Sequence, residues 1–335
     1  MDVVLSAKDL TVGYSDKKGG SLEVQSALNL ELRAGELTSL MGQNGAGKST
    51  LIRCLAGFAK PLMGEVSISG KPINRLSERE ISKLVSVVLT ENITQIGLSV
   101  YDLVSTGRYP YTGFFAKLSA DDHAKVVESL EVVGMNHFAN KMLNELSDGE
   151  RQKVMVAKAL AQETPIVILD EPTAFLDLPS RIELMHVLHQ LAVDHKKAVL
   201  LSTHDLEQAL RFSDTVWLID GERTIECGSP EDLLLQGKLK DFFGRDGIIF
   251  DSQSGTFRAE NLFCREVELI GDGVIRHWVA NALYRNGFTP SVEPNLPITI
   301  EICSGFPTEF ILSKPDSTTV KMGSVASLMR ELRAS

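Results

Sequence analysis

The nine residues from Gly42 to Thr50, GQNGAGKST, combine glycines, a lysine and hydroxyl side chains at the spacing of a phosphate-binding loop. Glycine leaves backbone amides accessible to phosphate oxygens, a lysine ammonium can reach the β- and γ-phosphates, and a serine hydroxyl can hold Mg²⁺. An ordinary glycine-rich turn between a strand and a helix is the alternative. We expect a nucleotide to be bound by Gly42, Asn44, Gly45, Gly47, Lys48, Ser49 and Thr50. We expect Ser49 also to hold the metal ion.

Two acidic residues, Asp170 and Glu171, directly follow the apolar run IVIL. Beside bound phosphates, Asp170 would hold the metal ion and Glu171 would polarise the attacking water as a general base. Such a pair is also a common helix cap, but a phosphate loop in the same chain favours the catalytic interpretation. His204 follows another apolar run, AVLLST, and we expect it to contact the γ-phosphate rather than to be an ordinary surface residue.

The segment LSDGE, Leu146 to Glu150, has two explanations. Ser147 and Glu150 have the spacing of an N-terminal capping box, in which each side chain accepts a hydrogen bond from the other residue's backbone amide. Gly149 falls in the first helical turn, where glycine is a poor helix former but leaves the amides accessible. Because a helix N-terminus with accessible amides attracts anions, the segment is also a candidate anion site.

A mainly parallel sheet would position these residues, because strand-like and helix-like segments alternate along the chain. The apolar runs ELTSLMG, KLVSVVLT, TPIVILDEP and KAVLLSTH each stop at polar residues. In an open parallel sheet, ligands bind where such strand ends converge on helix N-termini. We expect an α/β fold with an antiparallel edge strand in LEVQSALNLEL and a mostly helical subdomain over residues 100–162.

The pattern changes near Gly244, where short strands replace the earlier alternation. We predict a main domain over residues 1–244 and a small α+β domain over residues 245–335, built from a hairpin, further strands and one amphipathic helix. The second domain carries no catalytic constellation. We therefore expect it either to regulate or stabilise a dimer, or to pack inertly on the first.

The chain has 335 residues and a formal net charge of -10, which disfavours a dedicated nucleic-acid binder. No apolar run approaches the roughly 18 residues that span a bilayer, and the N-terminus lacks the apolar core of a signal peptide. The four cysteines lie far apart in sequence, without metal-ligand spacing, which favours a reducing, cytoplasmic compartment. We expect a soluble protein.

With these motifs in order, the chain resembles the nucleotide-binding subunits of the ATP-binding cassette (ABC) transporter family, which have a P-loop NTPase fold. The family order is phosphate loop, glutamine loop, signature, catalytic acids, aspartate loop and switch histidine, matched here by GQNGAGKST, VVLTEN, LSDGE, VILDEPT, AFLD and STH. The resemblance covers residues 4–240. It implies an ATPase that uses ATP and Mg²⁺ and acts as a head-to-tail homodimer, in which each signature helix contacts the ATP held by the partner subunit.

The resemblance assigns further roles by position. Ser147 and Gly149 would bind the γ-phosphate of the ATP held by the partner subunit, so the cap and the anion site would be one feature. Tyr14 would stack on adenine, with packing in the core as the alternative. Asp177 would link the two ATP sites across the dimer.

Two motifs depart from the family pattern. Asp148 and Glu150 replace a glycine and the glutamine of the signature, and we expect Asp148 to face solvent, away from the phosphate. In the glutamine loop, Thr90 stands where the glutamine is normally found, and Glu91 follows it. Because Mg²⁺ prefers oxygen ligands, we expect Thr90 or Glu91 to replace the glutamine as metal ligand; the alternative ligand is Gln95.

The segment LSVYDLVSTGRYPYTGFFAKLSADDHAKV resembles cassettes of importers for iron–siderophore chelates, haem and cobalamin. In those proteins the region docks the membrane subunits, so Tyr109, Tyr111, Phe114 and Phe115 would be exposed at an interface rather than packed within a helical subdomain. The resemblance implies an ATP-hydrolysing subunit at the cytoplasmic face of the cell membrane. Its partner would be a multi-span permease, with a substrate-binding protein as an indirect partner and no nucleic acid. The alternative is a soluble or weakly catalytic ATP-binding module that is not coupled to transport.

Overall fold

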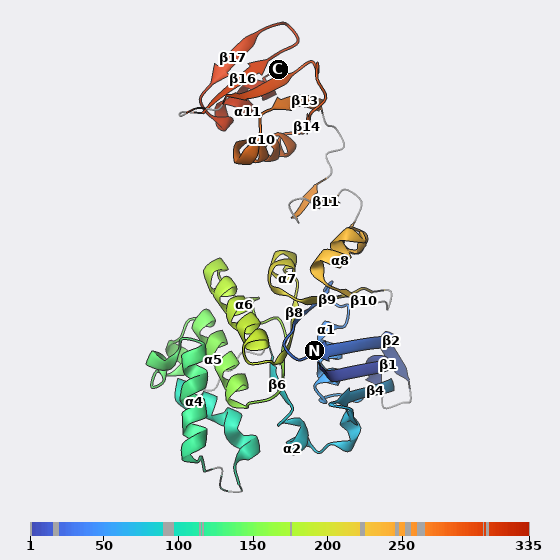
Figure 1. Ribbon diagram of the computed structural model, residues 1–335, viewed down its shortest axis with the longest axis vertical. Coiled ribbons are helices and arrows are strands. Elements are labelled where there is room, and N and C mark those ends of the chain that lie inside the picture. Colours follow the sequence, from blue (N-terminus) through green and yellow to red (C-terminus); the bar gives the residue numbers. More distant parts are fainter. Residues whose placement is uncertain are drawn as a thin grey trace. The chain divides into compact units, whose positions relative to one another are not determined.

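The computed structural model describes residues 2–15, 20–89, 97–113, 115, 117–174, 176–221, 225–244, 248–251, 256–259, 265–303, 305 and 308–334. The chain forms two compact units, Met1–Phe243 and Gly244–Ser335 (Figure 1). Among the described residues, no helix is both long enough and apolar enough to cross a membrane.

A six-stranded sheet forms the centre of the first unit. Its strand order is β10-β9-β3-β8-β7-β6, and all neighbours are parallel except β10 and β9, which are antiparallel. The strands are β3 (Leu37–Gly42), β6 (Val85–Val88), β7 (Ile166–Leu169), β8 (Ala198–Thr203), β9 (Thr215–Ile219) and β10 (Ile225–Gly228). Every residue of β7 and β8 is buried, as expected for parallel strands covered on both faces. Because β3, β7 and β8 run in one direction, their carboxyl ends lie at one edge of the sheet.

A second, antiparallel sheet has the strand order β2-β1-β4-β5. Its strands are β1 (Val3–Ser15), β2 (Ser21–Arg33), β4 (Met63–Ile68) and β5 (Lys71–Pro72). The segment LEVQSALNLEL lies within β2, so the expected antiparallel strand is confirmed. The buried residues Leu28, Leu30 and Leu32 alternate with exposed ones along this strand.

Helices cover the central sheet and form the helical subdomain. The α-helices of this unit are α1 (Lys48–Leu55), α2 (Glu78–Ile81), α3 (Val100–Ser105), α4 (Ala120–Val132), α5 (Asp148–Ala161), α6 (Leu178–Val193), α7 (Leu206–Phe212), α8 (Pro230–Leu235) and α9 (Lys238–Phe243). The short 3-10 turns are η1 (Ile73–Arg75), η2 (Thr106–Tyr111), η3 (Asn136–Phe138) and η4 (Leu143–Glu145). The mostly helical segment predicted over residues 100–162 is therefore confirmed.

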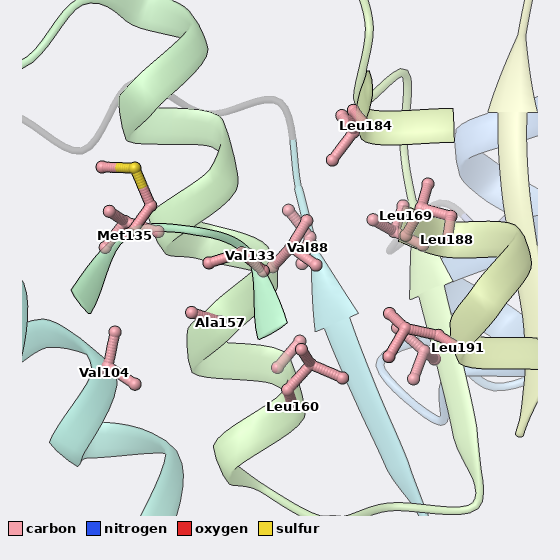
Figure 2. Packing of buried hydrophobic residues seen from close by; sticks show 14 of the residues in the cluster. Val88, Val104, Val133, Met135, Ala157, Leu160, Leu169, Leu184, Leu188 and Leu191 are labelled. Carbon is pink, nitrogen blue, oxygen red and sulfur yellow. The ribbon is translucent and has the colours of Figure 1, made fainter. Parts of the chain in front are cut away.

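One hydrophobic cluster joins the helical subdomain to the sheet. It contains Val104 of α3, Leu160 of α5, Val88 of β6, Leu169 of β7 and Leu188 of α6 (Figure 2). All five side chains are at most 8 % exposed. Helix α5 packs between α3 and strand β6 in this cluster, so its position relative to the strand ends is fixed.

The second unit is a small α+β fold. Its main sheet has the order β14-β13-β15-β16-β17, in which β13 is parallel to both β14 and β15 and the remaining pairs are antiparallel. The elements are the hairpin β11 (Ile248–Asp251) and β12 (Thr256–Ala259), the strands β13 (Arg265–Ile270), β14 (Phe288–Ser291), β15 (Thr299–Cys303), β16 (Glu309–Ser313) and β17 (Thr319–Met322), and the helices α10 (Gly273–Arg285) and α11 (Val325–Arg333). The expectation of a single helix is wrong, because α11 packs on β16 and β17 and buries Leu328, Met329 and Leu332.

Candidate functional site

The loop between β3 and α1 depends on glycine at both of its ends. A Cβ atom added to Gly42 would lie 2.5 Å from the Ile219 carbonyl oxygen, and one added to Gly47 would lie 2.3 Å from Val24 Cγ1. Gly47 also has a φ of +95°, a left-handed conformation that L side chains rarely adopt. The loop can therefore follow this path only because both positions lack a side chain.

A depression of about 280 Å³ lies over this loop. It is lined by Tyr14, Val24, Asn44, Gly45, Gly47, Lys48, Ser49, Thr50 and Glu171. All of these except Val24 are residues that the sequence predicted for nucleotide binding or catalysis. Tyr14 is 61 % exposed, and its hydroxyl lies 2.8 Å from Thr50 Oγ1, so the alternative of core packing for this ring is wrong.

Lys48, Glu171 and His204 come together although they follow three different strands. Lys48 is buried. Its ammonium donates to the carbonyls of Gly42 at 2.8 Å and Gln43 at 3.3 Å. The Glu171 carboxylate lies 4.0 Å from Lys48 Nζ through Oε1 and 3.8 Å from His204 Nδ1 through Oε2. A carboxylate is thus placed between the lysine of the phosphate loop and an exposed imidazole.

Asp170 is buried at the end of β7, 7 % exposed, and does not line the depression itself. Its Oδ1 atom accepts a hydrogen bond from Ser202 Oγ at 2.6 Å. The sequence analysis did not single out Ser202. The signal that could have identified it is a small hydroxyl within AVLLST, a run whose other inner positions are apolar.

Ser147 and Glu150 form the predicted capping box at the start of α5. Ser147 Oγ accepts from the Glu150 amide at 3.3 Å, and the Glu150 carboxylate accepts from the Ser147 amide at 2.7 Å. The Ser147 hydroxyl also donates to the Glu150 carboxylate at 2.8 Å. The bonds that this carboxylate accepts from the Ser147 backbone and side chain lower the pKa of Glu150. The Asp148 side chain is 68 % exposed and pairs with Arg151 at 2.9 Å, as expected.

Asp177 lies beside this helix start rather than at the phosphate loop. It caps α6 by accepting from the Ser180 amide at 3.2 Å, and a Cβ atom on Gly149 would lie 3.3 Å from Ser180 Oγ. None of Ser147, Gly149 and Asp177 is among the described residues that line the depression. Within one chain the structure therefore has two separate loci, the phosphate loop with the catalytic acids and the start of α5 with the start of α6.

Gln25 supports the phosphate loop from the antiparallel sheet, and the sequence analysis missed it. Its side-chain amide donates to the Ala46 carbonyl at 2.9 Å and to the Asp220 carbonyl at 2.7 Å. Strict alternation from Leu28 would place Gln25 on the exposed face of β2. Ala27 has a φ of 55°, and this irregularity in the strand brings Gln25 to the buried face.

The predicted metal ligands Thr90 and Glu91, and the alternative Gln95, lie outside the described residues, as does Phe114. The other aromatic residues of the predicted docking region are described. Tyr109 is 55 % exposed and Phe115 is 89 % exposed, whereas Tyr111 is 36 % exposed. Tyr111 also has a structural role, since its hydroxyl donates to the Gln162 carbonyl at 2.9 Å.

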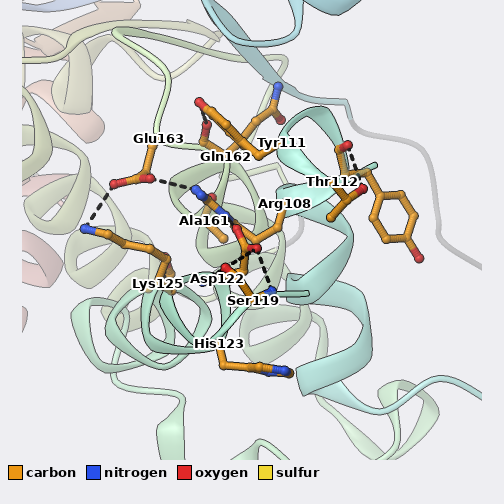
Figure 3. A network of polar contacts seen from close by, with 12 residues as sticks. Arg108, Tyr111, Thr112, Ser119, Asp122, His123, Lys125, Ala161, Gln162 and Glu163 are labelled. Atoms are coloured by element: carbon orange, nitrogen blue, oxygen red, sulfur yellow. Dashed lines mark hydrogen bonds and ion pairs between the residues drawn. The ribbon is translucent and has the colours of Figure 1, made fainter. Parts of the chain in front are cut away.

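A buried arginine, Arg108, connects this aromatic segment to the C-terminal end of α5 (Figure 3). Its guanidinium donates to Asp122 at 2.8 Å, to Glu163 at 2.7 Å and to the Ala161 carbonyl at 2.8 Å. The Tyr111 ring packs on it, 4.2 Å from the ring centroid to Cζ. Because these bonds join a buried charge to three different segments, they fix how those segments lie relative to one another.

Two families match the chain. Residues 26–174 match the family described as ABC transporter, and residues 264–333 match the family described as iron ABC transporter C-terminal domain. The first match contains the phosphate loop and the acids at the end of β7, and the second contains the five-stranded sheet of the second unit.

Individual relatives agree with these matches. An uncharacterized ABC transporter ATP-binding protein from Methanocaldococcus jannaschii is 36 % identical, with 83 % of this chain and 97 % of that protein covered. The iron(3+)-hydroxamate import ATP-binding protein of Bacillus subtilis is 33 % identical, with 73 % of this chain and 89 % of that protein covered. A bacterial ABC transporter cassette solved as a dimer has a TM-score of 0.58 and 28 % identity, with 66 % of this chain and 97 % of that chain covered. The chain therefore belongs to the ATP-binding proteins of ABC transporters, the subunits that bind and hydrolyse ATP.

Proposed function

We propose that this chain is the ATP-hydrolysing subunit that powers the import of an iron chelate (siderophore), haem or cobalamin through a membrane permease. The observation that carries the proposal is the convergence of the phosphate loop, the exposed Tyr14 ring and the Glu171 carboxylate at one depression. The match of the second unit to an iron-transporter family and the iron-hydroxamate relative support the class of transported substrate.

ATP would bind with adenine on Tyr14 and its phosphates over the loop from Gly42 to Thr50. The Lys48 ammonium already donates to two neutral backbone carbonyls, those of Gly42 and Gln43. Exchange of these acceptors for phosphate oxygens would give stronger, charge-assisted hydrogen bonds. The exposed hydroxyls and backbone amides of the loop would surround the remaining phosphate oxygens.

The oxygen donors near the loop fit Mg²⁺, which would neutralise charge on the phosphates. Ser49 and Asp170 would hold the ion, and from the sequence Thr90 or Glu91 would add a ligand. Among the described residues, no three acidic, histidine or cysteine side chains converge as a metal-binding group. A site with few protein ligands is typical of Mg²⁺, which keeps several waters and binds the substrate's phosphates.

Glu171 would accept a proton from the attacking water, because its carboxylate lies next to the lysine that contacts the phosphates. His204, 3.8 Å away from that carboxylate, would contact the γ-phosphate. Ser147 and Gly149 are not among the described residues that line the depression of their own chain, so they would complete the site of a second, head-to-tail copy. Asp177, at the start of α6 beside Gly149, would connect the two sites.

The exposed side chains Tyr109 and Phe115 would contact the permease at the cytoplasmic face of the membrane. A substrate-binding protein would deliver the chelate to the permease on the other side and have no direct contact with this chain. Pairing of two copies of the cassette is supported by the solved dimer of a similar cassette, and the head-to-tail arrangement is what the family resemblance implies.

The test is transport in proteoliposomes that contain this chain and the permease encoded nearest to its gene. We expect ATP-driven uptake of at least one ferric siderophore, haem or cobalamin, and no uptake with Glu171→Gln. ATP hydrolysis that is insensitive to the permease, without uptake of any of the three, would instead indicate a cassette that is not coupled to transport.

A further inference from the structure

The Ser202 hydroxyl contacts both acidic residues at the end of β7. Ser202 belongs to the neighbouring strand β8 and is fully buried. Its Oγ atom donates to Asp170 Oδ1 at 2.6 Å and accepts from the Glu171 backbone amide at 2.8 Å. The single hydroxyl proton of Ser202 is therefore donated to the Asp170 carboxylate, and a lone pair of the same oxygen accepts the Glu171 amide.

Glu171 has an unusual backbone conformation at this point. Its φ is 47°, in the left-handed region, which costs a residue other than glycine free energy and persists only when surrounding contacts hold it. The hydrogen bond from the Glu171 amide to Ser202 is such a contact. It fixes the direction in which the Glu171 side chain leaves the chain, toward Lys48 and His204.

The same hydroxyl orients the Asp170 carboxylate. A short hydrogen bond to a carboxylate is stronger than one between neutral groups, and a bond to one oxygen sets the rotation of the whole group. Asp170 is buried at 7 % exposure, so protein contacts such as this hydrogen bond, rather than bulk water, set the orientation of its carboxylate.

We propose that Ser202 is a positioning residue for ATP hydrolysis, which couples the orientation of the Asp170 carboxylate to the strained backbone of Glu171. The proposal rests on the proposed function as an ATPase. Ser202 does not line the depression and does not contact the nucleotide; it acts through the two acids.

The test compares Ser202→Ala with Ser39→Ala. Ser39 is also fully buried, lies on β3, the other neighbour of β8, and bonds Ser213 rather than either acid. Ser39→Ala therefore controls for the loss of a buried hydroxyl from the same sheet. Each variant is assayed as the full chain for ATP turnover and for equilibrium binding of a fluorescent ATP analogue, with Mg²⁺ and with EDTA.

For Ser202→Ala we expect turnover to fall about 10- to 100-fold, the range that corresponds to a lost hydrogen bond to a charged group. We expect KM for ATP and binding in EDTA to stay within about twofold, while the gain in affinity that Mg²⁺ gives is reduced at least several-fold. Ser39→Ala should leave all four quantities near the wild-type values.

Turnover and Mg²⁺-dependent binding of Ser202→Ala that match the wild type would overturn the proposal, and so would an equal loss in Ser39→Ala. If Ser202→Ala does not fold, Ser202→Cys is compared with Ser39→Ala in the same assays. Cysteine has a similar volume and keeps only a weak hydrogen-bond donor. If the wild-type chain binds MgATP without hydrolysing it, the proposed function fails, yet the Mg²⁺-dependent binding still decides the role of Ser202.

Discussion

At the residue scale, the site depends on the close approach of three side chains: the Lys48 ammonium, the Glu171 carboxylate and the His204 imidazole. Lys48 is held by two carbonyls, and Glu171 lies within 4.0 Å of it. This places the carboxylate beside the group expected to contact the β- and γ-phosphates. A carboxylate at this position can act as the general base that takes a proton from the attacking water.

Replacement of Glu171 by glutamine keeps the shape of the side chain and removes the base. We expect turnover to fall by roughly 10²- to 10⁴-fold, the usual contribution of a positioned base, with ATP binding retained and an ATP-bound dimer trapped. Phosphate release and size-exclusion chromatography with ATP measure the two effects. Glu207→Gln, at an exposed pair with Arg211 on α7, is the matched control; unchanged hydrolysis in Glu171→Gln would remove Glu171 from the role.

Two substitutions of Tyr14 distinguish stacking of the ring on adenine from hydrogen bonding by its hydroxyl. Stacking of a base on an aromatic ring is worth about 1 to 3 kcal/mol by alanine substitution, so Tyr14→Ala should weaken ATP binding by roughly 5- to 150-fold. Tyr14→Phe keeps the ring and loses only the contact with Thr50, so it should bind nearly as tightly as the wild type. Titration calorimetry distinguishes the outcomes, and equal affinities for the alanine variant and the wild type would show that adenine does not stack there.

At the element scale, α5 connects the signature segment to the segment expected to dock the permease. Its N-terminus carries the capping box of Ser147 and Glu150. At its other end, the carbonyl of its last residue, Ala161, and the side chain of Glu163 just beyond it bind Arg108. Arg108 follows α3 and Asp122 lies on α4. Specific hydrogen bonds as well as apolar packing therefore fix the helical subdomain to the C-terminal end of α5.

Asp122 makes this connection dependent on pH. Hydrogen bonds from the Ser119 side chain and backbone, and then from Arg108, lower its pKa from 3.8 to about 2. Because the folded-state pKa is depressed, the associated stabilisation, about 2 kcal/mol, is present above pH 4 and is lost as the pH falls toward 2. We expect Asp122→Asn to lower the free energy of unfolding at pH 7 and this deficit to shrink between pH 4 and pH 2.

Urea unfolding at a series of pH values measures that deficit. Asp121→Asn is the matched control, because it removes the same charge from the same helical turn at an exposed position. A deficit for Asp122→Asn that stays constant down to pH 2, or one equal to that of Asp121→Asn, would show that the Arg108 network does not stabilise the subdomain through this carboxylate.

The sequence predicted the elements that carry chemistry because each is a continuous apolar run that ends at polar residues. The strands before Gly42, Asp170 and His204 were recognisable in this way. The supporting residues were not, since Gln25 reaches the phosphate loop only through the irregularity at Ala27 and Ser202 meets the acids only through the pairing of β7 with β8. Their roles depend on which strands pair and in which register, and the local sequence does not determine either.

The second unit was less predictable for the same kind of reason. β14 contains Pro290, which argues against a central strand, but β14 is an edge strand, where proline is tolerated. β17 is another edge strand with partly exposed residues, so it lacks a clear apolar face. The helix α11 buries three apolar side chains, as many as the predicted helix α10. It is only nine residues long, shorter than the stretches in which helical periodicity is recognised with confidence.

At the scale of the whole molecule, every predicted and described residue of the ATP site lies in the unit Met1–Phe243. We therefore expect a chain that ends at Phe243 to bind ATP within about threefold of the full chain, a difference below 1 kcal/mol. The role of residues 245–335, regulation or support of the dimer, would appear as a change in turnover or dimerisation instead. Loss of nucleotide binding in a folded truncation would show that the second unit is needed to form the site.

The central claim is that a working ATP site combines the phosphate loop of one chain with the signature helix of another. Lys48→Ala destroys the first half, and Gly149→Asp places a negative charge at the second, where it would repel the γ-phosphate. Each variant alone should be inactive, because all of its composite sites carry the defect.

Mixing the two inactive variants and measuring ATP hydrolysis tests this claim most directly. In a head-to-tail heterodimer, one site has both defects and the other has an intact phosphate loop and an intact signature helix. Since random pairing of equal amounts makes half of the dimers mixed, we expect recovery of up to roughly a quarter of wild-type activity if the intact site works alone. A mixture as inactive as its components would contradict it.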